Sequence, residues 1–322
     1  MQPRYAATAL TTLAHTLLTA AGMDADKATT VAEILVEGDL LGHDTHGLAL
    51  LGPYLGELDT GAMTKSGAPV VINQRPATQV WDGLRLPGPW LVVQALEACA
   101  SMARTYGTGT VVIRRSHHIA ALAAYLKRAT DQGMLMLLYC SDRNSASVAP
   151  FGGRDPVFTP NPMAFGLPTG GDPILVDVSC SITTNGMSGR LAREGKRFPG
   201  RWLLDDQGQP TDDPRFGVPG GGGTIQLLGG TDAGHKGYGL TLMVEALTGG
   251  LDGATRQLDF VAAACHASTP RVAGQAVRLP GERAQARRAE QIAHGVLLHP
   301  SITPMLEPWA QKFGVAAPQA LS

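Results

Sequence analysis

A strand–helix–strand pattern runs through residues 110–139, which read TVVIRRSHHIAALAAYLKRATDQGMLMLLY. The β-branched run Thr110–Arg114 predicts a strand, because such side chains fit a pleated surface. A helix is expected from His117 to Thr130 with Ser116 as its N-cap. Gly133 then leads into a second apolar strand over Met134–Tyr139. Alternation of this kind indicates an α/β core.

The chain before this pattern reads as helical. Apolar spacing and capping residues predict three helices, over residues 4–21, 24–41 and 46–58. We therefore expect residues 1–69 to form a helical segment. This segment is expected to pack with C-terminal helices in residues 276–322.

Strands and helices continue to alternate after residue 69. Strands are expected over Ala77–Trp81 and Ile174–Val178, and helices over Pro89–Tyr106, Tyr238–Leu247 and Ala284–Leu298. The Gly-rich stretch from Gly217 to Gly237 is expected to be a mobile loop and a candidate lid, because glycine runs resist regular structure. Residues 70–253 are thus expected to form a central α/β domain, followed by a connection over 254–275.

Composition excludes several classes of protein. The 322 residues are 44% hydrophobic and 16% charged, so the chain can build a sizeable core. A net charge of -1 leaves no basic surplus for binding a nucleic acid. No wholly apolar run reaches the roughly 18 residues of a membrane span, since His15 and several threonines interrupt the uncharged stretch at 5–23. The four cysteines include no C-x-x-C pair. We expect a cytoplasmic protein without nucleic-acid or membrane partners, with cysteines that pack as small hydrophobic side chains.

Several nucleotide- and metal-binding motifs are missing from the sequence. It contains no G-x-G-x-x-G after a strand, no P-loop and no G-x-S-x-G elbow. His43 and His46 have the spacing of a metal pair, but no matching carboxylate or cysteine set accompanies them. No metal site is therefore expected.

Three polar residues are expected where α/β proteins gather ligands, near the ends of strands and the starts of helices. His46 and His118 each lie at the start of an expected helix, and Asp177 lies at the end of an expected strand. The positive end of a helix disfavours imidazolium, so both histidines should be neutral and able to exchange a proton. Each histidine could equally be a cap or a packing residue, and Asp177 a turn residue. These patterns alone indicate an α/β enzyme that binds a small molecule.

A set of motifs is more specific in combination. The motifs are GHDTHG at 42–47, VWDG at 80–83, RSHHIA at 115–120, PNPMAFG at 160–166, the Asp177 and Ser181 pair, and HKGYGL at 235–240. Together they resemble the malate/L-lactate/ureidoglycolate dehydrogenase family, which also contains sulfolactate dehydrogenases and cyclic-imine reductases of the piperideine-carboxylate type. The resemblance runs from the N-terminus to about Gly253 and resumes near Leu279.

The resemblance implies an α/β protein with a non-Rossmann, NAD(P)-binding mixed sheet, and a helical domain built from both ends of the chain. It also implies a homodimer with the active site near the dimer interface. The implied reaction is hydride transfer between nicotinamide and C2 of a 2-oxo acid or a cyclic imine acid. Whether the reduced bond is C=O or C=N, and whether the cofactor is NAD or NADP, stays open.

Site residues follow from the same resemblance. His46 would be the proton donor, beside Thr45 and oriented by Asp177, and His118 is the second candidate for this role. Cofactor phosphates would bind at an anion site at an expected helix start, formed by His235, Lys236 and Gly237. Further cofactor contacts would come from Ser141, Asn161 and Ser181.

Four departures from the family pattern bear on the substrate. Thr45 replaces a serine, Leu50 replaces an arginine that would grip the substrate carboxylate, and Met187 replaces a common lysine. Residues 254–275 form a shorter connection than in relatives. A less acidic, larger or carrier-tethered substrate would suit the apolar Leu50. An altered family member that acts as a binding or scaffold protein is the alternative interpretation.

Overall fold

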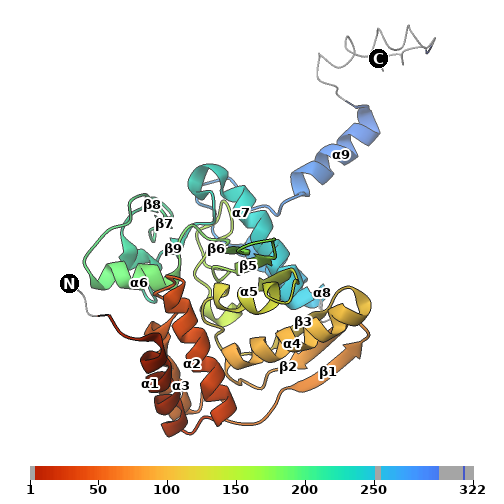
Figure 1. Cartoon of the computed structure of the whole chain (residues 1–322). Helices are drawn as coiled ribbons and strands as arrows, with labels where there is room; N and C mark the ends of the chain where they lie inside the picture. Colours follow the sequence, from red (N-terminus) through yellow and green to blue (C-terminus); the bar gives the residue numbers. More distant parts are fainter. Residues whose placement is uncertain (1–3, 251–254, 297–314, 316–322) are drawn as a thin grey trace. The chain divides into compact units, whose positions relative to one another are not determined.

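A computed structural model of the chain describes residues 4–250, 255–296 and 315 (Figure 1). Contacts group the chain into two units, Met1–Val277 and Arg278–Ser322. The described helix of the second unit is α9 (Glu282–His294). The expected packing of residues 1–69 with 276–322 stays a prediction, because much of 276–322 lies outside the described residues.

Helices of the first unit form where apolar spacing and good helix formers coincide. Their bounds are α1 (Ala7–Ala20), α2 (Ala25–Leu40), α3 (Leu51–Thr60), α4 (Gly88–Tyr106), α5 (Ala123–Thr130), α6 (Asn185–Arg193), α7 (Gly230–Glu245) and α8 (Thr255–Ala267). Short 3-10 turns are η1 (Leu48–Leu50), η2 (Arg143–Ser145) and η3 (Pro214–Gly217), and a π-helical turn, η4 (Ala246–Gly250), continues α7.

The strands of the described residues form three small sheets. Their bounds are β1 (Val70–Arg75), β2 (Thr78–Asp82), β3 (Thr110–Arg114), β4 (Met136–Tyr139), β5 (Pro162–Leu167), β6 (Ile174–Ser179), β7 (Leu203–Leu204), β8 (Pro210–Thr211) and β9 (Thr224–Ile225). The strand orders are β1-β2-β3, β4-β5-β6 and β8-β7-β9. The β2–β3 pair is parallel and the other pairs are antiparallel, so the first sheet is mixed.

The largest apolar core joins the N-terminal helices to the second sheet. Fully buried side chains from α2, α3 and α5, such as Ile34, Leu58 and Leu126, share one cluster with Ala164 of β5. Met136, Leu138 and Leu175 pack against this cluster from the sheet. The core therefore brings the turn before η1, the segment before α5 and the strand β6 to one place, although they are far apart in sequence.

Two expected helices begin later than the sequence predicts. The helix expected from His46 starts as η1 at Leu48, and the one expected from His117 starts at Ala123. Residues 117–122 instead form a loop, in which Ala120 adopts a φ of 57°. The carbonyls of His117 and His118 lie so close to Gly88 that a Cβ there would sit 2.4 Å and 2.3 Å from them. His118 is thus a loop residue, held against the first turn of α4.

The prediction of a mobile loop from Gly217 to Gly237 is also wrong over much of that stretch. Within it, β9 pairs with β7, and α7 begins at Gly230 rather than at Tyr238. A Cβ on Gly237 would lie 2.5 Å from the Leu228 carbonyl oxygen, so this glycine allows the helix to approach its neighbours closely. Glycine here serves close packing rather than mobility.

Candidate functional site

Thr45 and His46 lie in a turn that α2 holds in place. Asp39 Oδ2, at the end of α2, accepts a hydrogen bond from the Leu48 amide at 2.7 Å and so caps η1. A Cβ on Gly47 would lie 2.4 Å from the Asp39 carboxyl carbon, so only glycine leaves room for this cap. Thr45 Oγ1 is 2.8 Å from His46 Nδ1, which leaves Nε2 as the nitrogen of His46 that can face a ligand.

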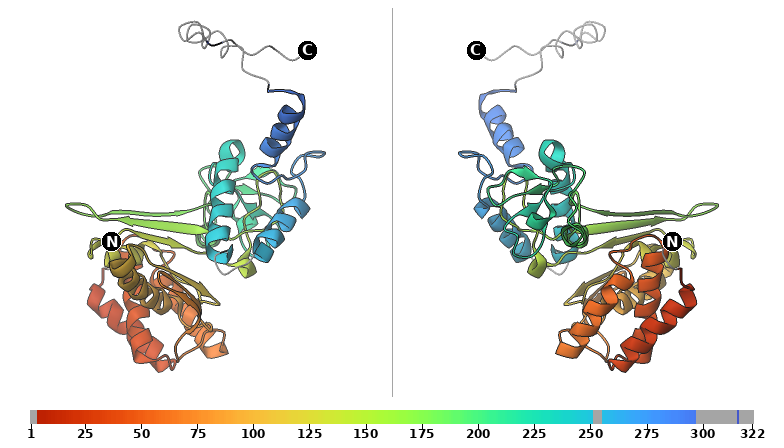
Figure 2. Two further views of the ribbon diagram at one scale, coloured as in Figure 1. Left: turned by 90° about the vertical axis from the view of Figure 1, so that its right-hand side faces the viewer. Right: turned by 90° about the vertical axis from the view of Figure 1, so that its left-hand side faces the viewer.

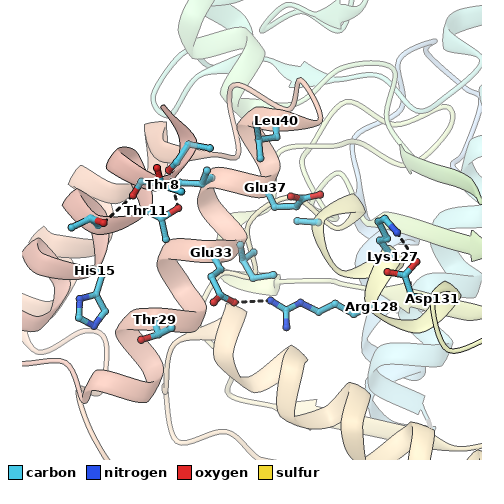
Figure 3. A pocket seen from close by; sticks show the side chains of 15 residues that line it. Thr8, Thr11, His15, Thr29, Glu33, Glu37, Leu40, Lys127, Arg128 and Asp131 are labelled. Atoms are coloured by element: carbon cyan, nitrogen blue, oxygen red, sulfur yellow. Dashed lines mark hydrogen bonds and ion pairs between the residues drawn. The ribbon is translucent and has the colours of Figure 1, made fainter. Parts of the chain in front are cut away.

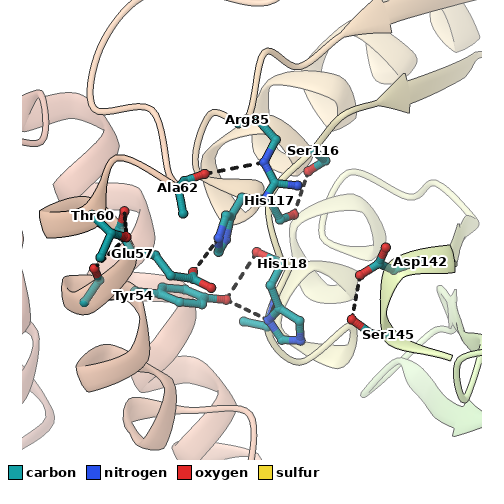
Figure 4. Close-up of polar contacts among 12 residues, drawn as sticks. Tyr54, Glu57, Thr60, Ala62, Arg85, Ser116, His117, His118, Asp142 and Ser145 are labelled. Carbon is teal, nitrogen blue, oxygen red and sulfur yellow. Dashed lines mark hydrogen bonds and ion pairs between the residues drawn. The ribbon is translucent and has the colours of Figure 1, made fainter. Parts of the chain in front are cut away.

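His118 stacks on His46. Their ring centroids are 5.9 Å apart and their planes differ by 24°. Figure 4 shows the His118 ring beside Tyr54 of α3, whose hydroxyl lies 2.8 Å from His118 Nδ1. The loop at 117–122, which replaces the expected helix start, therefore brings His118 next to His46. These two residues are the candidates for the proton donor.

Asp177 lies in β6, on the face of its sheet that packs against α5. Its Oδ2 accepts a hydrogen bond of 2.8 Å from the amide of Ala123, the first residue of α5. Among the described residues no hydrogen bond joins Asp177 to His46. The two interact through charge, because the Asp177 carboxylate opposes the lowering of the His46 pKa. Asp177 thus caps a helix and also places negative charge near His46.

The helix α6 covers the Thr45–His46 turn. A Cβ on Gly186 would lie 3.3 Å from Thr45 Cβ and 3.7 Å from His46 Cε1. Arg190 secures the contact, since its Nη1 is 2.8 Å from Asp44 Oδ2. Next to Gly186, Asn185 Oδ1 is buried and has no hydrogen-bond partner among the described residues. A buried amide oxygen without a donor is costly, so this atom is suited to accept a bond from a ligand.

Both histidines are neutral at physiological pH for a reason that differs from the expected one. Burial is the largest cause that lowers the pKa of His46, and Asp177 opposes it. Burial, followed by repulsion from His46 and His117, lowers the pKa of His118 to about 4. Neither ring lies in the first turn of a helix. The neutrality predicted from the sequence is therefore produced by desolvation and neighbouring rings rather than by a helix dipole.

The expected cofactor residues gather along α7 rather than around the two histidines. The Ser141 hydroxyl lies 2.8 Å from the Thr248 hydroxyl, just after α7. Asn161 is fully buried at a φ of 45°, and its Nδ2 donates to Glu245 of α7 at 2.7 Å. Thr159 donates to Asn161 Oδ1 at 2.7 Å. Asn161 thus ties the start of β5 to α7.

The remaining members of this set have different environments. Ser181 is buried, and its hydroxyl donates to the Thr183 carbonyl at 2.6 Å. His235 and Lys236 are exposed on α7, and the His235 ring contacts Phe151 edge-on at 5.8 Å. The prediction that Lys236 lies at a helix start and forms an anion site there is wrong. The helix α7 begins at Gly230, so Lys236 lies in its second turn.

Tyr54, Glu57 and His117 belong to the site but were not among the expected site residues. Glu57 Oε2 is 2.5 Å from Nε2 of the buried His117, and the His117 ring packs edge-on against Tyr54 at 5.5 Å. Tyr54 and Glu57 lie one turn apart on α3. That spacing was the available signal, but nothing in the sequence indicated that α3 faces residues 117–118.

A cavity among the described residues lies elsewhere. It has a volume of about 780 Å³ and opens between α1, α2 and α5 (Figure 3). Four of its charged side chains form two ion pairs, Arg128 with Glu33 at 2.9 Å and Lys127 with Asp131 at 2.5 Å. None of the four expected catalytic residues lines it. The cavity is therefore separate from the histidine cluster.

Membrane spans and metal clusters are both absent from the part of the chain that the structure describes. No helix there is both long and apolar enough to cross a membrane. No group of three or more metal-ligating side chains occurs among the same residues.

Comparison with known proteins gives one consistent result. Residues 5–259 match the model of the family described as malate/L-lactate dehydrogenase. An L-lactate dehydrogenase of Cupriavidus necator is 29% identical, over 96% of this chain and 97% of its own length. A Delta(1)-pyrroline-2-carboxylate reductase of Pseudomonas fluorescens is 30% identical, over 88% of this chain and 92% of its own.

A solved structure extends the similarity to three dimensions. Delta1-piperideine-2-carboxylate reductase from Pseudomonas syringae matches with a TM-score of 0.70 and 27% identity. The match covers 95% of this chain and 99% of that one. The relatives are thus named dehydrogenases and reductases, and the mixed α/β arrangement of helices and small sheets is theirs as well.

Proposed function

Because the chain belongs to the malate/L-lactate dehydrogenase family, we propose that it transfers a hydride from NAD(P)H to the C=O carbon of a 2-oxo acid or the C=N carbon of a cyclic imine acid. The observation that carries the proposal is the stacked pair of neutral rings, His46 and His118, 5.9 Å apart in the field of Asp177. Residues from three distant segments converge there, as an active site requires.

Residues near the pair and residues along α7 together fit a nicotinamide cofactor. The unpartnered Asn185 Oδ1 can accept a hydrogen bond from a carboxamide, the group that nicotinamide carries. The exposed His235 and Lys236 and the Ser141 hydroxyl are suited to phosphate and ribose oxygens. The backbone that carries these groups is positioned by three further residues, Asn161, Ser181 and Gly237. The bound cofactor would supply the hydride within a non-Rossmann fold.

His46 is the proton donor in this proposal. The Thr45 hydroxyl holds Nδ1 and orients the ring, so that Nε2 of the protonated ring passes its proton to the substrate oxygen or nitrogen. When C2 gains the hydride, the π electrons of the C=O or C=N bond move to the oxygen or nitrogen, and the His46 proton neutralises it. The Asp177 charge stabilises the imidazolium that precedes transfer. General acid catalysis of this kind contributes about 10²–10⁴-fold.

The substrate is proposed to be less acidic or larger than a simple 2-oxo acid. Leu50, where the family pattern has an arginine, packs against the apolar core and offers no positive charge. Met187 uses its backbone amide to bond Thr184 Oγ1 and likewise brings no cation. A KM in the low micromolar range for a small 2-oxo acid would contradict this part of the proposal.

A homodimer is proposed from the exposed part of an apolar sheet face, which α7 covers only in part around Phe165. In β4-β5-β6, alternate side chains point away from α5, and Leu137, Phe165 and Val176 are cross-strand neighbours. Leu137 is 53% exposed and Ile174 is 54% exposed. Figure 2 shows the β5–β6 hairpin, in green, extending from the neighbouring elements. An apolar sheet face of this kind is typical of a subunit interface.

A cytoplasmic, reducing location is proposed from the cysteines. All four are free. Burial raises the pKa of the Cys140 thiol to about 12 and that of Cys180 to about 11, so both pack as inert small side chains.

Nucleotide binding and turnover test the proposed function. NADH and NADPH are titrated by fluorescence, and oxidation is then followed against a panel of 2-oxo acids and cyclic imine acids. We expect binding of at least one nucleotide, and its oxidation by at least one substrate class. Failure of both nucleotides to bind would contradict the proposal and favour a binding or scaffold protein.

A further inference from the structure

His118 Nδ1 faces two hydrogen-bonding groups at once. The Tyr54 hydroxyl lies 2.8 Å from it (Figure 4), and the backbone amide of Ala120 donates to it at 3.2 Å. The Tyr54 hydroxyl also donates to the carbonyl oxygen of His118 at 3.2 Å, so Nδ1 and this oxygen share its proton. One side of the imidazole is therefore held by α3 and by the loop that follows His118.

The Ala120 amide determines where the ring carries its proton. A backbone N–H can only donate, so the nitrogen that accepts from it must present a lone pair. A neutral imidazole has one N–H, which therefore resides on Nε2. Ala120 adopts a φ of 57°, which an alanine rarely takes, and its amide reaches Nδ1 from this conformation.

Tyr54 is built to act as a donor to this ring. Its side chain is buried, and burial raises the pKa of its phenol far above the usual value, so the hydroxyl keeps its proton. The His117 ring packs edge-on against it at 5.5 Å, and Glu57 holds His117 in turn. The charged and titratable groups that face His118 are His46, His117 and Asp142.

We infer that Tyr54 is a positioning residue that, with the Ala120 amide, fixes His118 as its Nε2–H tautomer. His118 then serves as a hydrogen-bond donor to the substrate oxygen or nitrogen, while His46 carries the proton. This division of roles rests on the proposed function. The tautomer itself rests on geometry alone, and it can be tested without substrate.

The test is ¹⁵N NMR of the ring nitrogens in the full chain at neutral pH, with His118 assigned by its loss in His118→Gln. The wild type is expected to show an unprotonated Nδ1 and a protonated Nε2. In Tyr54→Phe the Nδ1 resonance should move, because one of its two partners is gone. A protonated Nδ1 in the wild type would overturn the inference, whether or not the protein turns over any substrate.

Kinetics then test the consequence of the tautomer. Tyr54→Phe should lower kcat about tenfold, equivalent to about 1.4 kcal/mol, with the KM for the nucleotide unchanged. Tyr125→Phe is the matched control, because Tyr125 is also fully buried but donates to the Ile119 carbonyl and not to an imidazole. It should leave the His118 resonances in place. Wild-type kcat and an unmoved Nδ1 resonance in Tyr54→Phe would remove Tyr54 from this role.

Discussion

His46 and His118 show how one environment can give two similar side chains different tasks. Both rings are neutral because burial lowers their pKa values, yet their Nδ1 atoms have different partners, Thr45 for His46 and Tyr54 with Ala120 for His118. Asp177 opposes the lowering of the pKa only at His46. His46 is consequently the ring that takes up and releases a proton more readily.

Replacing His46 tests its role as proton donor. His46→Gln keeps a polar side chain of similar reach but cannot transfer a proton, so kcat should fall about 10²–10⁴-fold. Nucleotide affinity, measured by fluorescence, should stay near the wild-type value. His15→Gln on α1 is the control and should leave kcat unchanged. Full turnover by His46→Gln would show that another group donates the proton.

The pH profile tests the charge of Asp177. Reduction needs protonated His46, so kcat/KM should fall as the pH rises through the His46 pKa, which lies below its usual value of 6.5. Asp177→Asn removes the charge that opposes this lowering, and the fall should move to still lower pH. The asparagine oxygen can still cap α5 at Ala123. A profile that stays in place or moves to higher pH would contradict the assignment.

Some strands and the long helices could be read from the sequence, whereas the other strands and most connections could not. The strand expected over Thr110–Arg114 and the helix expected over Pro89–Tyr106 match β3 and α4 closely. The start of α5 was misplaced because the loop before it depends on Gly88 and on the positive φ of Ala120, which are tertiary constraints. The strand β5 was not predicted, because two prolines flank Asn161 at its start and proline is rare inside strands.

Gly47 offers a test of the turn that carries His46. In Gly47→Ala the new Cβ would lie 2.4 Å from the Asp39 carboxyl carbon and displace the cap on Leu48. We expect a loss of about 0.5–2 kcal/mol in the free energy of unfolding, as for other lost caps. Urea denaturation measures it, and kcat should fall as His46 moves.

Gly52 in α3 is the matched control for this substitution, because no atom lies within 4 Å of a Cβ built there. Gly52→Ala should stabilise the protein by up to about 1 kcal/mol, since alanine is the better helix former. Equal stability changes in the two variants would show that the Asp39 cap does not depend on Gly47.

At the scale of the whole molecule, the site is assembled from segments that only the fold brings together. The turn at 43–47, the loop at 115–122 and β6 were each identified in the sequence, by residue type and by resemblance. Their meeting could not be derived, because it depends on a shared core of α2, α3, α5 and β5. Tyr54 and Glu57 could be identified as site residues only from the folded structure.

The exposed part of the β4-β5-β6 face, around Leu137 and Ile174, carries a prediction at the same scale. Leu137→Glu or Ile174→Glu would place a charge in the proposed interface and should convert a dimer to monomer in analytical ultracentrifugation. Tyr106→Glu, at a residue that is 56% exposed on α4, is the control and should leave the mass unchanged. A wild-type chain that sediments as a monomer at all concentrations would exclude this interface.

The most direct measurement of the central claim follows a labelled hydride. The protein is incubated with NADH or NADPH carrying deuterium at the transferable C4 position, together with 2-oxo acids or cyclic imine acids, and the products are analysed by mass spectrometry and NMR. The wild type should place deuterium on C2 of the product, and His46→Gln should do so far more slowly. Bound nucleotide that delivers no deuterium to any member of the panel would contradict the assignment as a reductase.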